Sequence, residues 1–185
     1  METKLTTRDL VLAALFAALT AASAWIWAPV FGEVPFTLQV LFVLMSGLVL
    51  GARLGALSIL AYLTLGLFAP VYAGGTSGLG VLFGPTGGYL WGFVLAAALA
   101  GALATRLGRT NPLVLCACAL AGLVPVYALG AVWLAWQLDL GLWAAVKVGV
   151  VPFVPFDAAK AGVAGFTAYA VARSPLGLLS PAREG

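Results

Sequence analysis

Long apolar runs, separated by glycine, proline and isolated charges, make up almost the whole chain. A helix that crosses a bilayer needs about 20 apolar residues, and the turn and charge signals between the runs predict six such helices in one membrane domain, residues 1–185. Their expected ranges are about 9–28, 36–50, 54–68, 85–107, 112–137 and 155–172. Residues 71–84 carry no charge and are rich in glycine, so we expect a long loop that either stays outside the bilayer or re-enters it.

The basic residues predict which side of the membrane each loop faces. If the N-terminus lies in the cytoplasm and the helices alternate in direction, both termini lie inside. Seven basic residues then fall on the cytoplasmic side: Lys4, Arg8, Arg53, Arg106, Arg109, Arg173 and Arg183. One basic residue, Lys147, falls in an outer loop, and Lys160 lies within a helix. Such an excess of cytoplasmic Lys and Arg is what the positive-inside rule requires of a correct topology.

Composition supports a membrane protein and excludes several other classes. Apolar residues make up 63% of the chain and charged residues 8%, whereas soluble domains contain about 25% charged residues. The fold class is therefore an all-α integral membrane protein. A net charge of +3 is too small to indicate nucleic-acid binding, and it is carried by residues at the ends of apolar runs.

The residue types needed for common enzyme chemistry are missing from the sequence. The chain contains no histidine, which removes the usual general base and the commonest metal ligand. Cys116 and Cys118 are two positions apart in an apolar run, so on a helix they point to different faces and do not pair. No Gly-Lys pair occurs, so there is no P-loop for ATP. We expect neither an enzyme nor a metal site.

Two ionisable residues inside the last predicted helix carry the strongest functional signal. Asp157 and Lys160 are three positions apart, so they share one helical face about one turn from the outer end. A charge at the bilayer centre costs about 2.5 to 3.5 kcal/mol on insertion scales, and such residues usually face the bundle interior or a cavity. One interpretation is a self-contained ion pair that stabilises the helix. The other is a ligand pocket in which Lys160 meets an anionic group and Asp157 accepts N–H bonds.

Aromatic residues and helix starts gather at the same outer side. Three predicted helices begin there, near residues 36, 85 and 155, and converging helix N-termini favour a small anion such as a carboxylate. The aromatic set comprises Trp25, Trp27, Trp91, Trp133, Trp136, Trp143, Phe36, Tyr72, Tyr89 and Phe156. It either walls a pocket for a flat or bicyclic ligand or forms an interfacial belt.

The first predicted helix carries two parallel rows of alanine at spacing four. The rows are Ala13, Ala17 and Ala21, and beside them Ala14, Ala18 and Ala22. Small residues at this spacing allow helix backbones to approach closely. The partner helix belongs either to this chain or to another protein.

Four stretches, taken in order, closely resemble the BioY family, the biotin-specific S components of energy-coupling factor transporters. They are DLVLAALFAALT at residues 9–20, VPFTLQ at 34–39, AGGTSGLGVLFGPTGGY at 73–89 and GVVPFVPFDAAK at 149–160. The GPTGGY loop combined with the helix start PF-x-P-x-D-x-x-K is specific, whereas residues 110–148 carry little of the family pattern. Phe156 stands where the family commonly has glycine.

The resemblance implies a six-helix S-component fold with a vitamin site near the outer face, closed by loops. It implies that Asp157 and Lys160 contact biotin. We expect Asp157 to take the ureido N–H groups and Lys160 the carboxylate; the reverse assignment, or contact of both with one end through water, stays open. Further contact candidates are Thr37, Gln39, Ser77 and Tyr89. No cofactor is expected besides the ligand biotin.

The resemblance also implies partners and a location. The face of the first helix that carries Ala13, Ala17 and Ala21 is expected to dock on a membrane coupling subunit, and two cytoplasmic ATPases supply the energy. The protein is then a multi-pass protein of a bacterial-type plasma membrane, and transport requires the bundle to tilt when the coupling subunit engages. The alternative is an autonomous or homo-oligomeric biotin transporter that uses Asp157 for proton coupling.

Overall fold

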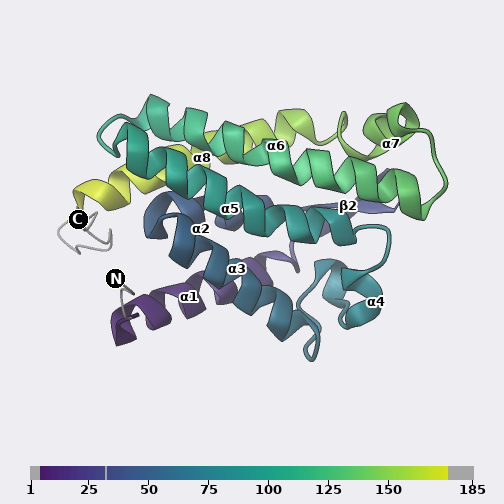
Figure 1. The fold of residues 1–185 in the computed structure, drawn as a ribbon, viewed down its shortest axis with the longest axis horizontal. Helices are drawn as coiled ribbons and strands as arrows, with labels where there is room; N and C mark the ends of the chain where they lie inside the picture. Colours follow the sequence, from purple (N-terminus) through teal and green to yellow (C-terminus); the bar gives the residue numbers. More distant parts are fainter. Residues whose placement is uncertain (1–4, 32, 175–185) are drawn as a thin grey trace.

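Six helices of 12 or more residues occupy the six segments expected to be helical (Figure 1). A computed structural model of the chain describes residues 5–31 and 33–174. These six helices are α1 (Thr7–Ser23), α2 (Gln39–Leu50), α3 (Ala52–Gly66), α5 (Gly87–Leu107), α6 (Pro112–Gln137) and α8 (Val154–Arg173). The shorter elements are strands β1 (Trp27–Phe31) and β2 (Val34–Thr37), the 3-10 turn η1 (Ala73–Gly75) and helices α4 (Leu79–Leu82) and α7 (Leu142–Gly149).

Local sequence explains where several helices begin. Thr6 caps α1: its hydroxyl accepts from the Asp9 N–H while the Asp9 carboxylate accepts from the Thr6 N–H, which satisfies two free donors of the first turn. The Asn111 side chain accepts from Leu113 N–H at the start of α6, and proline follows at the first helical position, where its missing N–H costs nothing. Proline also lies in the first turn of α8.

The helices pack as two groups joined through α2 and α3, both of which pack on α5. The most extensive contact is between α5 and α6, and α6 packs in turn on α8. On the other side α1 packs against α3 and α2. Helix α2 contacts both α5 and α8. Phe36 and Thr37, just before α2, contact Phe156 and Lys160 of α8, so the start of α2 lies beside the start of α8.

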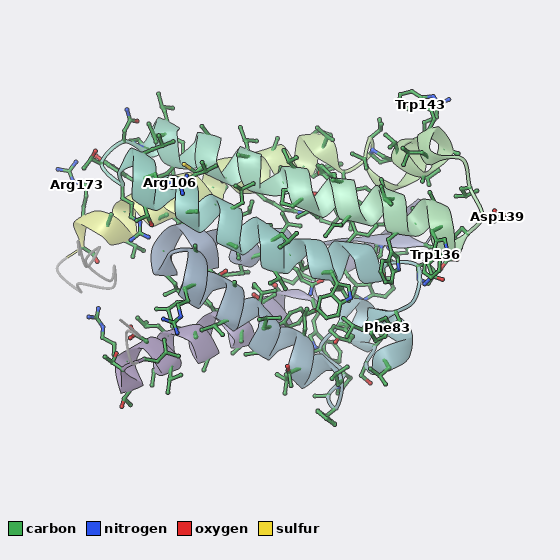
Figure 2. All side chains as sticks on the ribbon, in the orientation of Figure 1. Phe83, Arg106, Trp136, Asp139, Trp143 and Arg173 are labelled. Carbon is green, nitrogen blue, oxygen red and sulfur yellow. The ribbon has the colours of Figure 1, made fainter. Side chains whose placement is uncertain are left out.

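The two ends of the bundle differ in chemistry. Figure 2 places Arg106 and Arg173 at one end and Trp136, Asp139 and Trp143 at the other. Helix α1 starts and α8 finishes at the arginine end, whereas β2, α4 and α7 lie at the tryptophan end (Figure 1). Lys4 and Arg183, two of the seven basic residues counted as cytoplasmic, lie outside the described residues.

A β-hairpin replaces the expected end of the first helix and start of the second. Helix α1 ends at Ser23, five residues before the predicted limit, and β1 pairs antiparallel with β2, with Pro29 opposite Pro35. Two prolines without N–H groups cannot continue a helical ladder, and the aromatic and β-branched residues beside them favour strands. The predicted helix limits were therefore wrong at residues 27, 28, 36 and 37, which lie in strands. Helix α7 was not predicted either.

Two helices in the described part of the chain, α5 and α6, are long and apolar enough to cross a bilayer alone. Helices α7 and α8 meet at a bend of 57° and make a third such segment if they are counted as one. Helices α2 and α3 are apolar but shorter.

The two alanine rows of α1 have opposite surroundings. Ala13, Ala17 and Ala21 are 8%, 6% and 7% exposed and lie inside the bundle, on the helix that packs against α2 and α3. The neighbouring row is exposed and consists of Ala14, Ala18 and Ala22. The row that we expected to meet a partner protein is therefore covered by this chain itself, because the backbones of the bundle approach closely along it.

Candidate ligand-binding site

A cavity lies where the first turns of α2, α5 and α8 converge. It encloses about 630 Å³ of space between atoms, a volume that includes the open solvent at its mouth. Its polar lining residues are Thr37, Gln39, Tyr72, Thr86, Tyr89, Tyr127, Asp157 and Lys160. Its apolar and glycine lining residues are Val34, Pro35, Val40, Ala73, Val81, Leu90, Phe93, Val126, Gly149 and Phe153.

Asp157 and Lys160 meet in the wall of this cavity. Their side chains form an ion pair of 2.7 Å from Lys160 Nζ to Asp157 Oδ1, and the two residues are 4% and 7% exposed. Lys160 Nζ also donates to the Thr37 carbonyl at 2.6 Å and lies 4.0 Å from the centre of the Phe36 ring. The pair is thus both an internal ion pair and part of the cavity lining, so the two interpretations of the sequence are compatible.

Tyr127 of α6 completes the polar cluster, and the sequence reasoning missed it. Its hydroxyl donates to Asp157 Oδ2 at 2.8 Å, so both carboxylate oxygens hold a proton donor from the protein. The one signal in the sequence was a lone hydroxyl in a long apolar helix, two residues after Pro125. That signal has no meaning until the partner on α8 is known.

The structure brings three of the four further candidates to the cavity. Thr37, Gln39 and Tyr89 line it, whereas Ser77 is exposed and does not belong to its lining. The Gln39 amide nitrogen donates to the Tyr62 hydroxyl, which leaves the amide oxygen as the end that can meet a ligand. The Tyr89 hydroxyl donates to the Gly149 carbonyl at 2.9 Å.

Among the described residues, the aromatic side chains that line the cavity are Tyr72, Tyr89, Phe93, Tyr127 and Phe153, and none of them is tryptophan. Trp25, Trp27, Trp136 and Trp143 are exposed, as expected of an interfacial belt. Phe156, at the family's usual glycine position, is exposed and packs edge-on against Phe36 at 5.3 Å. Of the predicted aromatic set, Tyr72 and Tyr89 line the cavity and the other members do not.

The segments that close the cavity are held in two different ways. On the α6 side, Trp133 Nε1 donates to the Gly84 carbonyl at 2.9 Å and the Gln137 amide donates to the Phe83 carbonyl. On the α3 side, the Tyr72 ring is fully buried over Gly66, where any Cβ atom would collide with it. The Tyr72 hydroxyl donates to the Leu63 carbonyl at 2.7 Å, and burial raises its pKa, so it stays protonated as a donor.

The cavity can recognise a neutral polar group attached to an apolar body. Most of its lining is apolar, and among the described lining residues the charged groups are Asp157 and Lys160, which compensate each other. A carboxylate beside an ammonium offers one acceptor and one donor, which match the N–H and C=O edge of an amide or urea. The fold and the cavity together define a class, helical membrane proteins that enclose one small organic ligand.

Comparison with known proteins gives the family. The model of the BioY family matches residues 1–175. The chain is 44% identical over 162 residues to the biotin transporter BioY of Thermotoga maritima. That alignment covers 87% of this chain and 94% of the relative. It is 40% identical over 182 residues to the biotin transporter BioY of Rhodobacter capsulatus. That alignment covers 90% of this chain and 94% of the relative.

A solved structure has the same fold. The S component for biotin of an ECF-type ABC transporter superposes with a TM-score of 0.85 at 27% identity, over 92% of this chain and 96% of that one. The chain belongs to the BioY family, a family of membrane transporters and not a class of enzymes.

Proposed function

We propose that this chain is the biotin-binding, substrate-capture subunit of an energy-coupling factor transporter and that the cavity at the start of α8 is its biotin site. The observation that carries the proposal is the cluster of buried Asp157 and Lys160 with half-buried Tyr127 in the wall of the cavity. The relatives named as biotin transporters support the choice of ligand. The chain releases the vitamin unchanged and uses no cofactor.

The ion pair supports placing the ureido end of biotin at the start of α8. Lys160 Nζ is 2.7 Å from Asp157 Oδ1. Because the carboxylate and ureido groups of biotin are far apart, two side chains this close together contact the same end of the ligand. Asp157 accepts the ureido N–H groups, and Lys160 donates to the ureido carbonyl rather than to the carboxylate. This arrangement favours the alternative in which both residues contact one end of biotin.

The proposal includes six membrane-spanning segments with both termini in the cytoplasm. The described helices α1, α2, α3, α5, α6 and α8 supply the segments. Support comes from Arg106 and Arg173 at one end of the bundle and Trp136 and Trp143 at the other (Figure 2), because arginine marks cytoplasmic ends and tryptophan the interface. The cavity then opens toward the outer face.

The coupling partner is a membrane subunit that joins the chain to two cytoplasmic ATPases. The exposed row of α1 (Ala14, Ala18 and Ala22) replaces the buried row of Ala13, Ala17 and Ala21 as its docking face. An Ala18→Leu variant is expected to bind biotin normally and to lose uptake in membranes that contain the coupling module. The control, Ala17→Leu, places extra atoms inside the bundle and is expected to lower thermal stability by about 1 to 3 kcal/mol. Normal uptake by Ala18→Leu would contradict this docking face.

Titration of the detergent-purified protein with biotin tests the function directly. Isothermal titration calorimetry is expected to give saturable binding of one biotin per chain, and absence of heat and of retained radiolabelled biotin would contradict the proposal. Reconstitution then separates the two transport classes. Uptake into vesicles that requires the coupling subunit, both ATPases and ATP supports the S-component role, whereas uptake by the chain alone, driven by a proton gradient, supports an autonomous transporter.

A further inference from the structure

We propose that Tyr127 determines specificity at this site by forming, together with Asp157, a pair of acceptors for the two ureido N–H groups of the ligand. The proposal rests on the proposed function, because it names a further ligand contact in the same cavity. Tyr127 comes from α6 and Asp157 from α8, 30 positions later in the chain. Both residues line the cavity.

Counting protons in the cluster shows which ligand groups it can satisfy. Asp157 receives a donor on each oxygen, Lys160 on Oδ1 and Tyr127 on Oδ2. The single hydroxyl proton of Tyr127 is used in this bond, so its oxygen is left with acceptor capacity alone. Each carboxylate oxygen also keeps a free lone-pair direction. Asp157 and Tyr127 therefore present acceptors to the cavity, and a ligand must bring donors to them.

The donor in the cluster is separate from these acceptors. Lys160 Nζ spends two of its three protons on Asp157 Oδ1 and the Thr37 carbonyl. The third has no oxygen or nitrogen acceptor among the described residues, where the Phe36 ring lies 4.0 Å from Nζ, and we assign it to an acceptor of the ligand. A cyclic urea carries one carbonyl between two N–H groups. The cluster is complementary to that order when Lys160 meets the carbonyl and Asp157 and Tyr127 take one N–H each.

Buried acceptors penalise a ligand that lacks the matching donor. A site built to hydrogen-bond a donor leaves its own groups unpaired when the donor is absent, and this rejects the analogue more strongly than a missing methylene does. Analogues in which one ureido N–H is replaced by oxygen, giving a cyclic carbamate, remove one donor without added bulk. Two such regioisomers exist. One lacks the N–H that faces Asp157, and the other lacks the N–H that faces Tyr127.

The test measures the affinity of wild type and Tyr127→Phe for biotin and for both carbamates. Wild type is expected to bind biotin at least about tenfold more tightly than either carbamate. Tyr127→Phe is expected to bind biotin about tenfold more weakly than wild type and to bind one carbamate regioisomer with less than a twofold loss, so that discrimination at one position disappears. The matched control is Tyr169→Phe on α8, where the hydroxyl lies at the exposed arginine end and accepts from Arg173.

Each other outcome overturns a defined part of the argument. Equal loss for biotin and both carbamates in Tyr127→Phe would mean that Tyr127 only tethers α6 to α8. Unchanged biotin affinity would remove Tyr127 from the site. If Tyr127→Phe does not fold, wild-type affinities decide: equal binding of biotin and both carbamates overturns the acceptor pair. Failure of wild type to bind biotin overturns the proposed function instead.

Discussion

The two sides of the cavity are built from different kinds of structure. The α5–α6–α8 side carries the charges and is fixed by side-chain bonds between distant residues: Trp133 to the Gly84 carbonyl, Tyr89 to the Gly149 carbonyl and Tyr127 to the Asp157 carboxylate. The side formed by the β-hairpin and residues 67–82 is held by the buried ring of Tyr72 and by the bond from Lys160 to the Thr37 carbonyl. Near it, the rings of Trp27 and Trp25 lie against the backbone of Gly74 and Gly75.

This difference assigns two tasks to the two sides: the helical side recognises the polar groups of the ligand, and the loop side closes the cavity to water. Polar recognition needs side chains held within a few tenths of an ångström, and helices provide that rigidity. Closure needs a surface that excludes water, which one buried aromatic residue and two exposed rings supply with few directional bonds. We therefore expect changes on the helical side to act on affinity and stability together, and changes on the loop side to act mainly on stability.

The largest effect is expected from breaking the ion pair. Lys160→Ala leaves Asp157 buried without its cation, and removal of one partner of a buried pair costs about 3 to 5 kcal/mol. We expect biotin affinity to fall more than about 100-fold and the melting temperature to drop, as measured by calorimetric titration and thermal unfolding in detergent. Asp157→Asn is expected to weaken binding similarly.

The double variant Asp157→Asn with Lys160→Met is the control for this prediction. It removes both charges, so stability is expected to return while binding does not. Unchanged affinity in both single variants would contradict the placement of the site.

A smaller effect is expected where α7 meets α5. Gly149→Ala would place a Cβ atom against the Tyr89 hydroxyl, so Tyr89 must move and its bond to the Gly149 carbonyl must break. We expect a loss of about 1 to 3 kcal/mol in unfolding free energy and a lower biotin affinity, since both residues line the cavity. Gly141→Ala, at the start of the same helix with open space around it, is the matched control and is expected to leave both quantities unchanged. Equal effects of the two variants would show that α7 is not fixed by this contact.

On the loop side, Tyr72→Phe removes one hydroxyl and keeps the ring. The buried Leu63 carbonyl loses its side-chain donor, which costs about 0.5 to 1.5 kcal/mol, and biotin affinity is expected to change less than threefold. Thermal unfolding and biotin titration measure the two quantities. Thr76→Val removes an exposed hydroxyl that donates to the Ala73 carbonyl in the same segment and serves as the control. A loss of affinity as large as that of Lys160→Ala would overturn the separation of recognition from closure.

The smallest effect is expected at Ser77. Its side chain is exposed and outside the cavity lining, so Ser77→Ala is expected to change stability by less than about 0.5 kcal/mol and to leave biotin affinity unaltered. The comparison is Gln39→Leu, which removes a buried amide from the lining and leaves the Tyr62 hydroxyl without its partner. Weaker binding by Ser77→Ala would show that the loop moves onto the ligand.

The helical segments and the charged pair could be predicted from sequence because both depend on local spacing. Apolar runs of sufficient length locate the helices, and the separation of three residues between Asp157 and Lys160 places them on one face in any helix. The hairpin could not be located in this way, because residues 24–28 continue the apolar run of α1 without a charge or glycine to interrupt it.

The remaining features depend on which helices become neighbours. Tyr127 acquires its role from Asp157, which lies on another helix, and a single sequence does not show that pairing. The same holds for α1, where the two alanine rows are equivalent in sequence until α2 and α3 cover one of them. Tertiary packing, not residue type, separates Ala17 from Ala18.

The bond from Lys160 to the Thr37 carbonyl joins positions 123 residues apart. A nascent polypeptide that has inserted everything up to α7 therefore has the hydrophobic lining of the pocket but neither charge, and its Thr37 carbonyl has no lysine to meet. If the cavity is the biotin site as proposed, vitamin capture requires the last helix to have reached the bilayer. A product that ends before α8 is then expected not to bind biotin and not to compete with the finished protein for it.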